Sequence, residues 1–262
     1  MQYKKVLDFN ISYGRYNDFV KEIVLSAKQN ISSYVCIANV HMFIEAYRDK
    51  LFLDVIDNAN IATPDGMPLV LALRFLKGIV QERVAGMDLL PDLLKIAEQE
   101  KIKIFFYGGT ELMLNKTKLY IKEAYPELLV EGYHSPPFRE LTVSESDEIV
   151  SKINNLGVGI VFVVLGCPKQ EKWMYSMKGR INSCMIGIGG ALPVLVGMNK
   201  RAPIWMQKRS LEWLYRLIQE PRRLFMRYLV TNSLFVFIIM REYIKMKLNI
   251  YWYRINKKKN NS

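Results

Sequence analysis

The chain has 262 residues and a formal net charge of +12 at pH 7, with 50% hydrophobic and 24% charged residues. This composition excludes a mainly disordered chain and allows one large domain or a domain with an appendage. Residues 201–262 hold 14 lysines and arginines against three acidic residues, a net charge of +11, while residues 1–200 are nearly neutral. We therefore expect two parts: an α/β body over 1–200 and a basic, apolar appendage over 201–262.

Within the body, short apolar runs alternate with amphipathic stretches. The runs expected to form strands are Lys5–Phe9, Tyr34–Ala38, Lys103–Tyr107, Leu128–Tyr133, Ile160–Leu165 and Cys184–Ile188. The stretches expected to form helices are Tyr16–Gln29, Asp88–Gln99, Leu112–Ala124, Ser144–Asn155 and Gln170–Lys178. Such alternation predicts a Rossmann-like, mainly parallel sheet flanked by helices.

Cysteine and histidine usage argues against a metal or disulfide framework. Cys36, Cys167 and Cys184 have no CxxC spacing, and His41 and His134 are far apart in the sequence. We expect reduced thiols and no zinc site. No Asp-x-Asp pair occurs either, so a metal-bridged nucleotide-sugar site is not expected. The first ten residues do not resemble a signal peptide.

Two polar residues follow apolar runs near the front of the body. Asn39 comes directly after the strand ending at Ala38, where an amide would meet a sugar or base edge, but it would equally cap the next helix. Asp65 lies in a Thr63-Pro64-Asp65-Gly66 turn that would aim its carboxylate into a cleft. The alternative is that Asp65 caps the following helix.

Two further motifs offer donors for an anion. Arg83 and Gly86 precede a helix and would bind a diphosphate through a guanidinium and backbone amides; the alternative is a surface turn. In the Gly166–Glu171 turn, the free amides at the start of a helix, beside Gln170, would meet an anion or a uracil edge. Ordinary helix initiation is the alternative there.

Several predicted strands run directly into glycine, at Gly108, Gly109, Gly166 and Gly189. Glycine at the carboxyl end of a parallel strand lets backbone amides approach a ligand. Gly187-Ile188-Gly189 alone is a weak dinucleotide signal, because Leu192 occupies the third glycine position and no acidic residue follows at the usual distance.

The appendage combines arginines with large apolar side chains. Arg209, Arg216 and Arg223 are seven residues apart and Arg227 follows, so a helix would carry a guanidinium stripe that clamps a diphosphate or simply faces solvent. The longest apolar stretch, Tyr228–Met240, has 13 residues, so we expect it to lie in a membrane interface or to pack on a partner, and not to span a bilayer. Because the appendage is as apolar as it is basic, an anionic membrane surface is favoured over nucleic acid.

These motifs together resemble the WecB/TagA/CpsF family of bacterial glycosyltransferases, glycosyltransferase family 26. The resemblance runs from about Asn39 to Tyr228. Its most specific pieces are Thr63-Pro64-Asp65-Gly66, Arg83–Asp88, Gly166–Glu171, Arg201-Ala202-Pro203, and Leu211–Arg216 with Glu220-Pro221.

The resemblance implies an activity. Members move a sugar, most often N-acetylmannosamine, from a UDP-sugar donor to an undecaprenyl-diphosphate-linked acceptor, in teichoic acid or surface polysaccharide synthesis. It also implies inverting transfer without a metal or cofactor, a peripheral position on the cytoplasmic face of the membrane, and association into a homo-oligomer as an option.

The resemblance further implies roles for individual residues. Asp65 would be the general base. Substrate binding would involve Asn39, Thr63, Arg83, Gly108, Gly109, Gly166, Gln170, Glu171 and Gly189, and the lipid diphosphate would be held by Arg216, Arg223 and Arg227. The chain departs from the family at Ile37, where threonine is common, and near Pro193, where an acidic residue is usual.

Two other functions are compatible with parts of the sequence. A membrane-attached nucleotide-binding regulator would use the same crevice without chemistry. The interpretation of the chain as an NAD-dependent oxidoreductase would depend only on Gly187-Ile188-Gly189. Within the family, the donor sugar is not fixed by these motifs.

Overall fold

The computed structural model describes residues 1–209 and 211–259, without the side chains of residues 208, 223 and 250–259. The strands are β1 (Gln2–Val6), β2 (Phe9–Tyr13), β3 (Ser33–Ala38), β4 (Ile61–Pro64), β5 (Ile104–Gly108), β6 (Val130–His134), β7 (Ile160–Val164) and β8 (Cys184–Gly187). The helices are α1 (Tyr16–Lys28), α2 (Val40–Arg48), α3 (Lys50–Asp57), α4 (Met67–Lys77), α5 (Gly86–Gln99), α6 (Glu111–Ala124), α7 (Val143–Asn155), α8 (Lys169–Met177), α9 (Ala191–Leu195), α10 (Ile204–Lys208), α11 (Glu212–Gln219) and α12 (Pro221–Lys259).

The body is built on a six-stranded sheet with the order β4-β3-β8-β7-β5-β6, in which all paired strands are parallel. Strands β3, β5, β7 and β8 are buried along their whole length, as expected for a sheet covered on both faces. The predicted α/β fold is therefore confirmed. All six carboxyl ends meet at one edge of the sheet, where the loops that carry the candidate residues follow.

The beginning of the chain differs from the expectation of a single strand over Lys5–Phe9. It forms an antiparallel hairpin in which Val6 pairs with Phe9. Leu7, between the strands, has φ 55°, a left-handed conformation that turns the chain there. Val6 and Phe9 are both buried, so the apolar run supplies two strands rather than one. The backbone amide of Ala62 donates to the Ser12 hydroxyl at 3.0 Å, which holds the hairpin beside β4.

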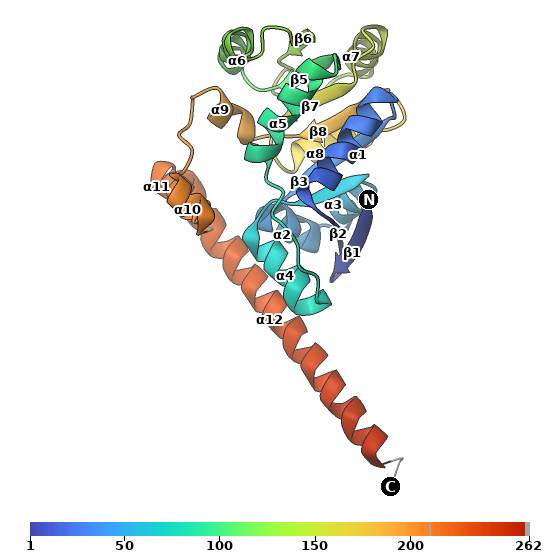
Figure 1. Cartoon of the computed structure of the whole chain (residues 1–262), viewed down its shortest axis with the longest axis vertical. Helices are drawn as coiled ribbons and strands as arrows, with labels where there is room; N and C mark the ends of the chain where they lie inside the picture. Colours follow the sequence, from blue (N-terminus) through green and yellow to red (C-terminus); the bar gives the residue numbers. More distant parts are fainter. Residues whose placement is uncertain (210, 260–262) are drawn as a thin grey trace.

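Helices cover both faces of the sheet and make three layers (Figure 1). One core contains buried residues from α2, α3, α4, α7 and α8, together with Phe235 and Ile238 of α12. The other contains buried residues from α1, α5, α6 and α9. Because α12 contributes to the first core, the appendage is packed against the body.

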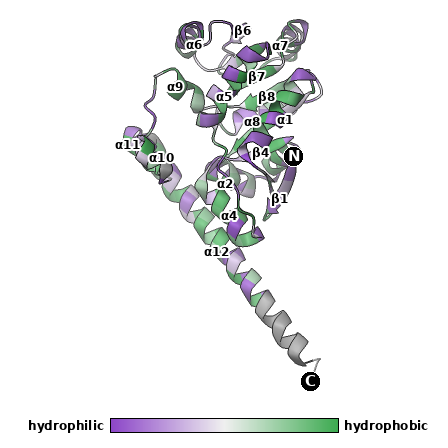
Figure 2. Ribbon diagram, in the orientation of Figure 1, coloured by the Kyte–Doolittle hydropathy of each residue, from purple (hydrophilic) through white to green (hydrophobic). Residues whose placement is uncertain are grey.

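The appendage consists of α10, α11 and the long helix α12, which lies along α2 and α4 (Figure 1). Pro221 begins α12, as proline can at the first helical position. Phe235 contacts Phe43 of α2 with ring centroids 5.1 Å apart, and Tyr243 contacts Phe75 of α4 at 6.2 Å. Hydrophobic residues line α4 and the adjoining part of α12 (Figure 2).

The expectation that no segment is long enough to cross a membrane is corrected by this helix. Leu224–Asn249, 26 residues with a mean hydropathy of 1.4, is long and apolar enough by length and composition, and no other segment of the described residues passes that test. That expectation rested on uncharged runs alone, whereas the few charged residues within α12 do not interrupt the helix. Such a helix by itself is weak evidence for a span, because core helices can pass the same test.

Candidate active site

Asp65 lies at the carboxyl end of β4 and is fixed there by its own backbone. Its amide donates to the carbonyl of Ala38 at 2.9 Å and to that of Thr63 at 3.1 Å. The N-cap residue of α4 is Gly66, which directly precedes the helix, and this helix start has no side-chain cap. Asp65 therefore does not have the capping role considered from the sequence, and its side chain is partly exposed next to the end of β3.

Thr63 ties the segment that carries Arg83 to β4. The Thr63 hydroxyl donates to the carbonyl of Val84 at 3.1 Å, and the amide of Val84 donates to the carbonyl of Pro64 at 3.0 Å. Thr63 is completely buried. Its hydroxyl thus holds the loop that carries Arg83, which is a positioning role; substrate contact by Thr63 stays a prediction.

The charge environment of Asp65 suits a base. Burial raises the pKa of the Asp65 carboxyl to about 6, while the guanidiniums of Arg83 and Arg216 lower it and the carboxylates of Glu212 and Asp88 raise it. A carboxylate with a pKa near 6 is mostly ionised at neutral pH yet more basic than an exposed aspartate. Such a group can accept a proton during a reaction.

Asn39 and His41 begin α2, at the end of the neighbouring strand β3. The Asn39 Oδ1 accepts a hydrogen bond from the amide of Met42 at 3.1 Å, so the capping interpretation is confirmed. Its amide nitrogen is the group that would meet a ligand. Burial and the nearby Arg227 guanidinium lower the pKa of His41, whose Nδ1 lies 3.7 Å from the Glu45 carboxylate. These contacts fit a structural histidine.

Gln170 is buried at the carboxyl ends of β7 and β8. Its Oε1 accepts from the amide of Gly166 at 3.2 Å. A Cβ at Gly187 would lie 2.8 Å from the Gln170 Nε2, and one at Gly189 would lie 3.0 Å from its Oε1. The glycines at 187 and 189 therefore make room for a glutamine side chain, a function different from the dinucleotide contact that a Gly-x-Gly pattern suggests.

Glu171 is completely buried next to Gln170 and accepts a hydrogen bond from its Nε2 at 2.7 Å. Burial raises the pKa of Glu171 to about 7, although contacts with Gln170 and Cys167 lower it. Neither Gln170 nor Glu171 is open to solvent, so their visible role is to hold the turn after β7. Substrate contact by either residue stays a prediction.

Gly108 ends β5 and Gly109 follows it, on the same edge of the sheet but three strands from β3. Gly108 has φ +103°, and a Cβ there would lie 2.6 Å from the carbonyl oxygen of Val164. The Gly109 amide donates to that same oxygen at 2.8 Å. Gly108 is thus required by the close approach of β5 and β7, and β8 and β7 separate both glycines from the Asp65 side.

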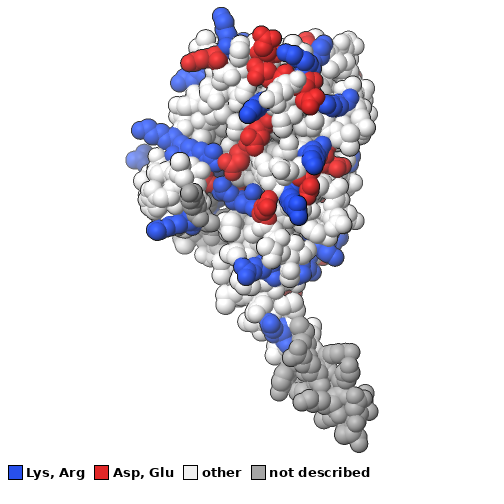
Figure 3. Space-filling view, in the orientation of Figure 1, with Lys and Arg blue, Asp and Glu red and all other residues white. Residues whose placement is uncertain are grey.

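The appendage brings arginines to this edge. A Cβ at Gly190 would lie 2.6 Å from a terminal nitrogen of Arg216, so the Arg216 guanidinium covers the turn after β8. Arg227 lies near His41 and over the Tyr228 ring at 5.6 Å. Arg223 belongs to α12, but its side chain lies outside the described residues. Basic side chains gather over α10 and α11, with acidic side chains beside them (Figure 3).

Two residues of this region received no role from the sequence, Arg201 and Glu212. Glu212 pairs with Arg83, and Arg201 pairs with Asp88. Arg201 and Glu212 both lie within sequence motifs. The pairing of Glu212 with Arg83, however, joins residues 129 positions apart and leaves no local pattern in the sequence. The departures from the family pattern also have a structural setting. The Ile37 side chain is buried and would lie 3.0 Å from a Cβ at Gly86, while Pro193 lies within the short helix α9.

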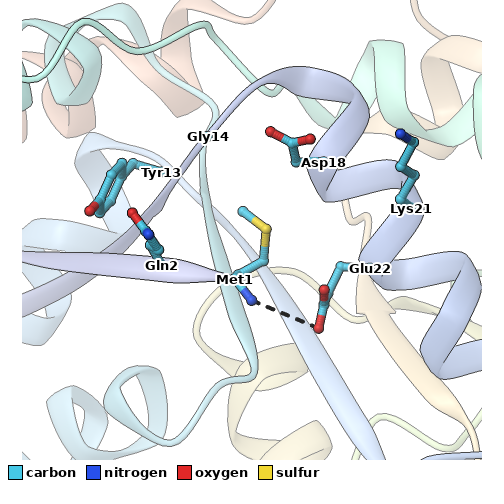
Figure 4. Close-up of a pocket in the computed structure, with 7 residues that line it drawn as sticks. All are labelled: Met1, Gln2, Tyr13, Gly14, Asp18, Lys21 and Glu22. Carbon is cyan, nitrogen blue, oxygen red and sulfur yellow. Dashed lines mark ion pairs between the residues drawn. The ribbon is translucent and has the colours of Figure 1, made fainter.

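Two cavities lie outside this constellation. One, of about 490 Å³, lies between the hairpin and α1 (Figure 4); there Asp18 and Glu22 face Met1, whose amino group is 3.8 Å from Glu22. The other, of about 220 Å³, lies between α5 and α9 and reaches Arg201.

In the described part of the chain, no three His, Cys, Asp or Glu side chains are grouped to hold a metal. Metal-independent chemistry stays a prediction.

Fold and site together define an α/β enzyme that would bind its substrate at the carboxyl edge of a parallel sheet, with a carboxylate and two guanidiniums there. The family model described as "Glycosyl transferase WecG/TagA/CpsF family" matches residues 4–249. The chain belongs to this family and is a glycosyltransferase. The match includes most of the N-terminal hairpin and most of α12, and both lie beyond the range of the motifs.

Three curated relatives share one activity in their names, N-acetylglucosaminyldiphosphoundecaprenol N-acetyl-beta-D-mannosaminyltransferase. The protein of Bacillus subtilis (strain 168) is 32% identical over 74% of this chain and 75% of its own length. The protein of Bacillus spizizenii is 29% identical over 85% of this chain and 86% of its own length. The protein of Staphylococcus aureus (strain MW2) is 28% identical over 79% of this chain and 84% of its own length.

Proposed function

We propose that this chain transfers N-acetylmannosamine from UDP-N-acetylmannosamine to undecaprenyl-diphosphate-linked N-acetylglucosamine, with inversion at the anomeric carbon. The names of the relatives support the transferred sugar and the acceptor. The observation that carries the mechanism is the Asp65 carboxylate, whose backbone is fixed at the end of β4 and whose pKa is lowered by the guanidiniums of Arg83 and Arg216.

In this mechanism, the acceptor hydroxyl attacks the anomeric carbon of the donor and passes its proton to Asp65. A carbon–oxygen bond forms on one face of the sugar while the bond to UDP breaks on the other. UDP leaves with the bonding electrons, and Arg83 offers a guanidinium to one of the phosphate groups. Arg216, with Arg223 and Arg227, would hold the diphosphate of the acceptor, because guanidiniums bind phosphates through paired, charge-assisted hydrogen bonds.

We further propose that α12 lies in the surface of an anionic membrane, on the cytoplasmic side. Its exposed large side chains are Phe225, Met226, Leu229, Val230, Val236, Phe237, Met240, Ile244 and Leu248. At 100° per residue they cover one face about 140° wide, opposite the buried Phe235 and Ile238. Because that buried face packs on the body, an interfacial position fits α12 better than a crossing of the bilayer.

A transfer assay tests the proposed activity. The full chain is incubated with a lipid-diphosphate-N-acetylglucosamine acceptor and, in parallel, with UDP-N-acetylmannosamine, UDP-N-acetylglucosamine, UDP-glucose and UDP-glucuronic acid. We expect a disaccharide product that depends on UDP-N-acetylmannosamine and on a lipid diphosphate, with and without a metal chelator. A product with a different sugar would correct the donor; no product with any of them would overturn the proposal.

A further inference from the structure

Two arginines and two carboxylates form a closed ion-pair network between the body and the appendage. Arg83 pairs with Glu212 of α11 and lies 3.4 Å from Asp88 of α5. Arg201, at the start of the appendage, pairs with the same Asp88, and its Nε lies 3.6 Å from Glu212. Each carboxylate therefore bridges both guanidiniums, and the network joins three separate parts of the chain.

Glu212 is the least accessible member of this network. Its side chain is 13% exposed, against 21% for Arg83 and 31% for Arg201. A carboxylate at the surface gives a weak ion pair, but one that is largely desolvated and shared by two guanidiniums fixes their geometry and leaves unpaired charge if it is removed. The contact with Glu212 is thus the part of the network that solvent can least replace.

The position of Glu212 in α11 links it to the reacting groups. Arg216 follows Glu212 by four residues, so both side chains project from the same face of the helix. Glu212 contacts Arg83, and Arg216 contacts the Gly190 turn after β8. The charged groups around Asp65 accordingly come from three places: Arg83 from the loop after α4, Asp88 from α5, and Glu212 with Arg216 from α11.

We propose that Glu212 is a positioning residue, which docks α11 on the body and holds Arg83 and Arg216 in the orientation that substrate binding at Asp65 requires. The inference rests on the proposed role of Asp65. It adds that the appendage completes the active site through a carboxylate as well as through arginines. Glu212 itself touches no reacting atom in this scheme.

The test replaces Glu212 by glutamine, which keeps the shape and removes the charge. We expect kcat/KM for the lipid-linked acceptor to fall on the order of tenfold or more. We also expect the acidic limb of the pH profile to move to lower pH, because the Glu212 carboxylate raises the pKa of Asp65. The pH at which this limb occurs does not depend on the fraction of the enzyme that is folded. Glu212→Asp, which retains the charge, should keep the limb near its original position.

Glu145→Gln is the matched control. Glu145 also accepts two hydrogen bonds from an arginine, Arg139, but the pair is exposed and lies at the start of α7, away from α11 (Figure 1). Its kinetics should equal those of the unmodified chain. If the unmodified chain is active and Glu212→Gln matches Glu145→Gln in rate and in pH profile, the positioning role is wrong while the proposed function stands. An inactive unmodified chain would instead refute the proposed function.

Discussion

Asp65→Asn should lower kcat by about 10²–10⁴-fold, the usual contribution of a general base. Asparagine has nearly the same shape, and the backbone hydrogen bonds that fix position 65 come from the main chain, so the fold should persist. The amide, however, cannot accept the proton of the acceptor hydroxyl. The measurement is the single-turnover rate with saturating donor and acceptor, together with the melting temperature.

Asn39→Ala serves as a comparison for this variant. It removes the cap on α2 and should cost about 1 kcal/mol of stability. The base, however, stays in place. If Asn39 only orients substrate, the chemical step should slow less than in Asp65→Asn. Retention of the full rate by Asp65→Asn would show that another group removes the proton.

The second large effect concerns the apolar face of α12. Replacing Phe237 and Met240 by serine should weaken binding to vesicles rich in anionic lipid by two orders of magnitude or more. Both side chains are exposed, and burying each in the interface contributes about 1.5–3 kcal/mol. Since neither belongs to the core of the body, the folded structure should be unaffected. Co-sedimentation at several lipid concentrations measures the change.

Phe138→Ser with Leu119→Ser is the matched control. Both residues are exposed, and they lie after β6 and in α6, at the opposite end of the molecule from the free end of α12 (Figure 1). This variant should bind vesicles as the unmodified chain does. Equal binding by all three proteins would refute the membrane face on α12. Resistance of bound protein to a high-salt wash and to alkaline extraction would instead favour a spanning helix.

The sequence predicted the layout of the site because that layout follows from local patterns. Buried apolar runs marked the strands, and a parallel sheet brings their carboxyl ends to one edge. Asn39 and Asp65 follow β3 and β4, and both were expected after apolar runs; that these two strands are neighbours in the sheet was not predicted and is seen only in the structure. The capping role of Asn39 is equally local, because it joins residues three positions apart.

The rest could not be predicted because it depends on contacts between distant parts of the chain. The Thr63–Val84 hydrogen bond, the Gln170 side chain over two glycines and the Arg83–Glu212 pair each join segments without a shared pattern. Gly187 and Gly189 show the consequence most clearly. Their spacing suggested a nucleotide loop, yet the atoms nearest to them belong to a glutamine from the neighbouring turn.

The pH dependence of kcat/KM tests the role of Asp65 most directly. Because the base must be ionised, the account predicts that kcat/KM falls about tenfold per pH unit below an apparent pKa of about 6 and levels off above it. The limb should persist in Glu171→Gln, which removes the buried carboxyl of Glu171, whose pKa is raised to about 7. A profile that is flat from pH 5 to 8, or a limb that disappears in Glu171→Gln, would contradict the account.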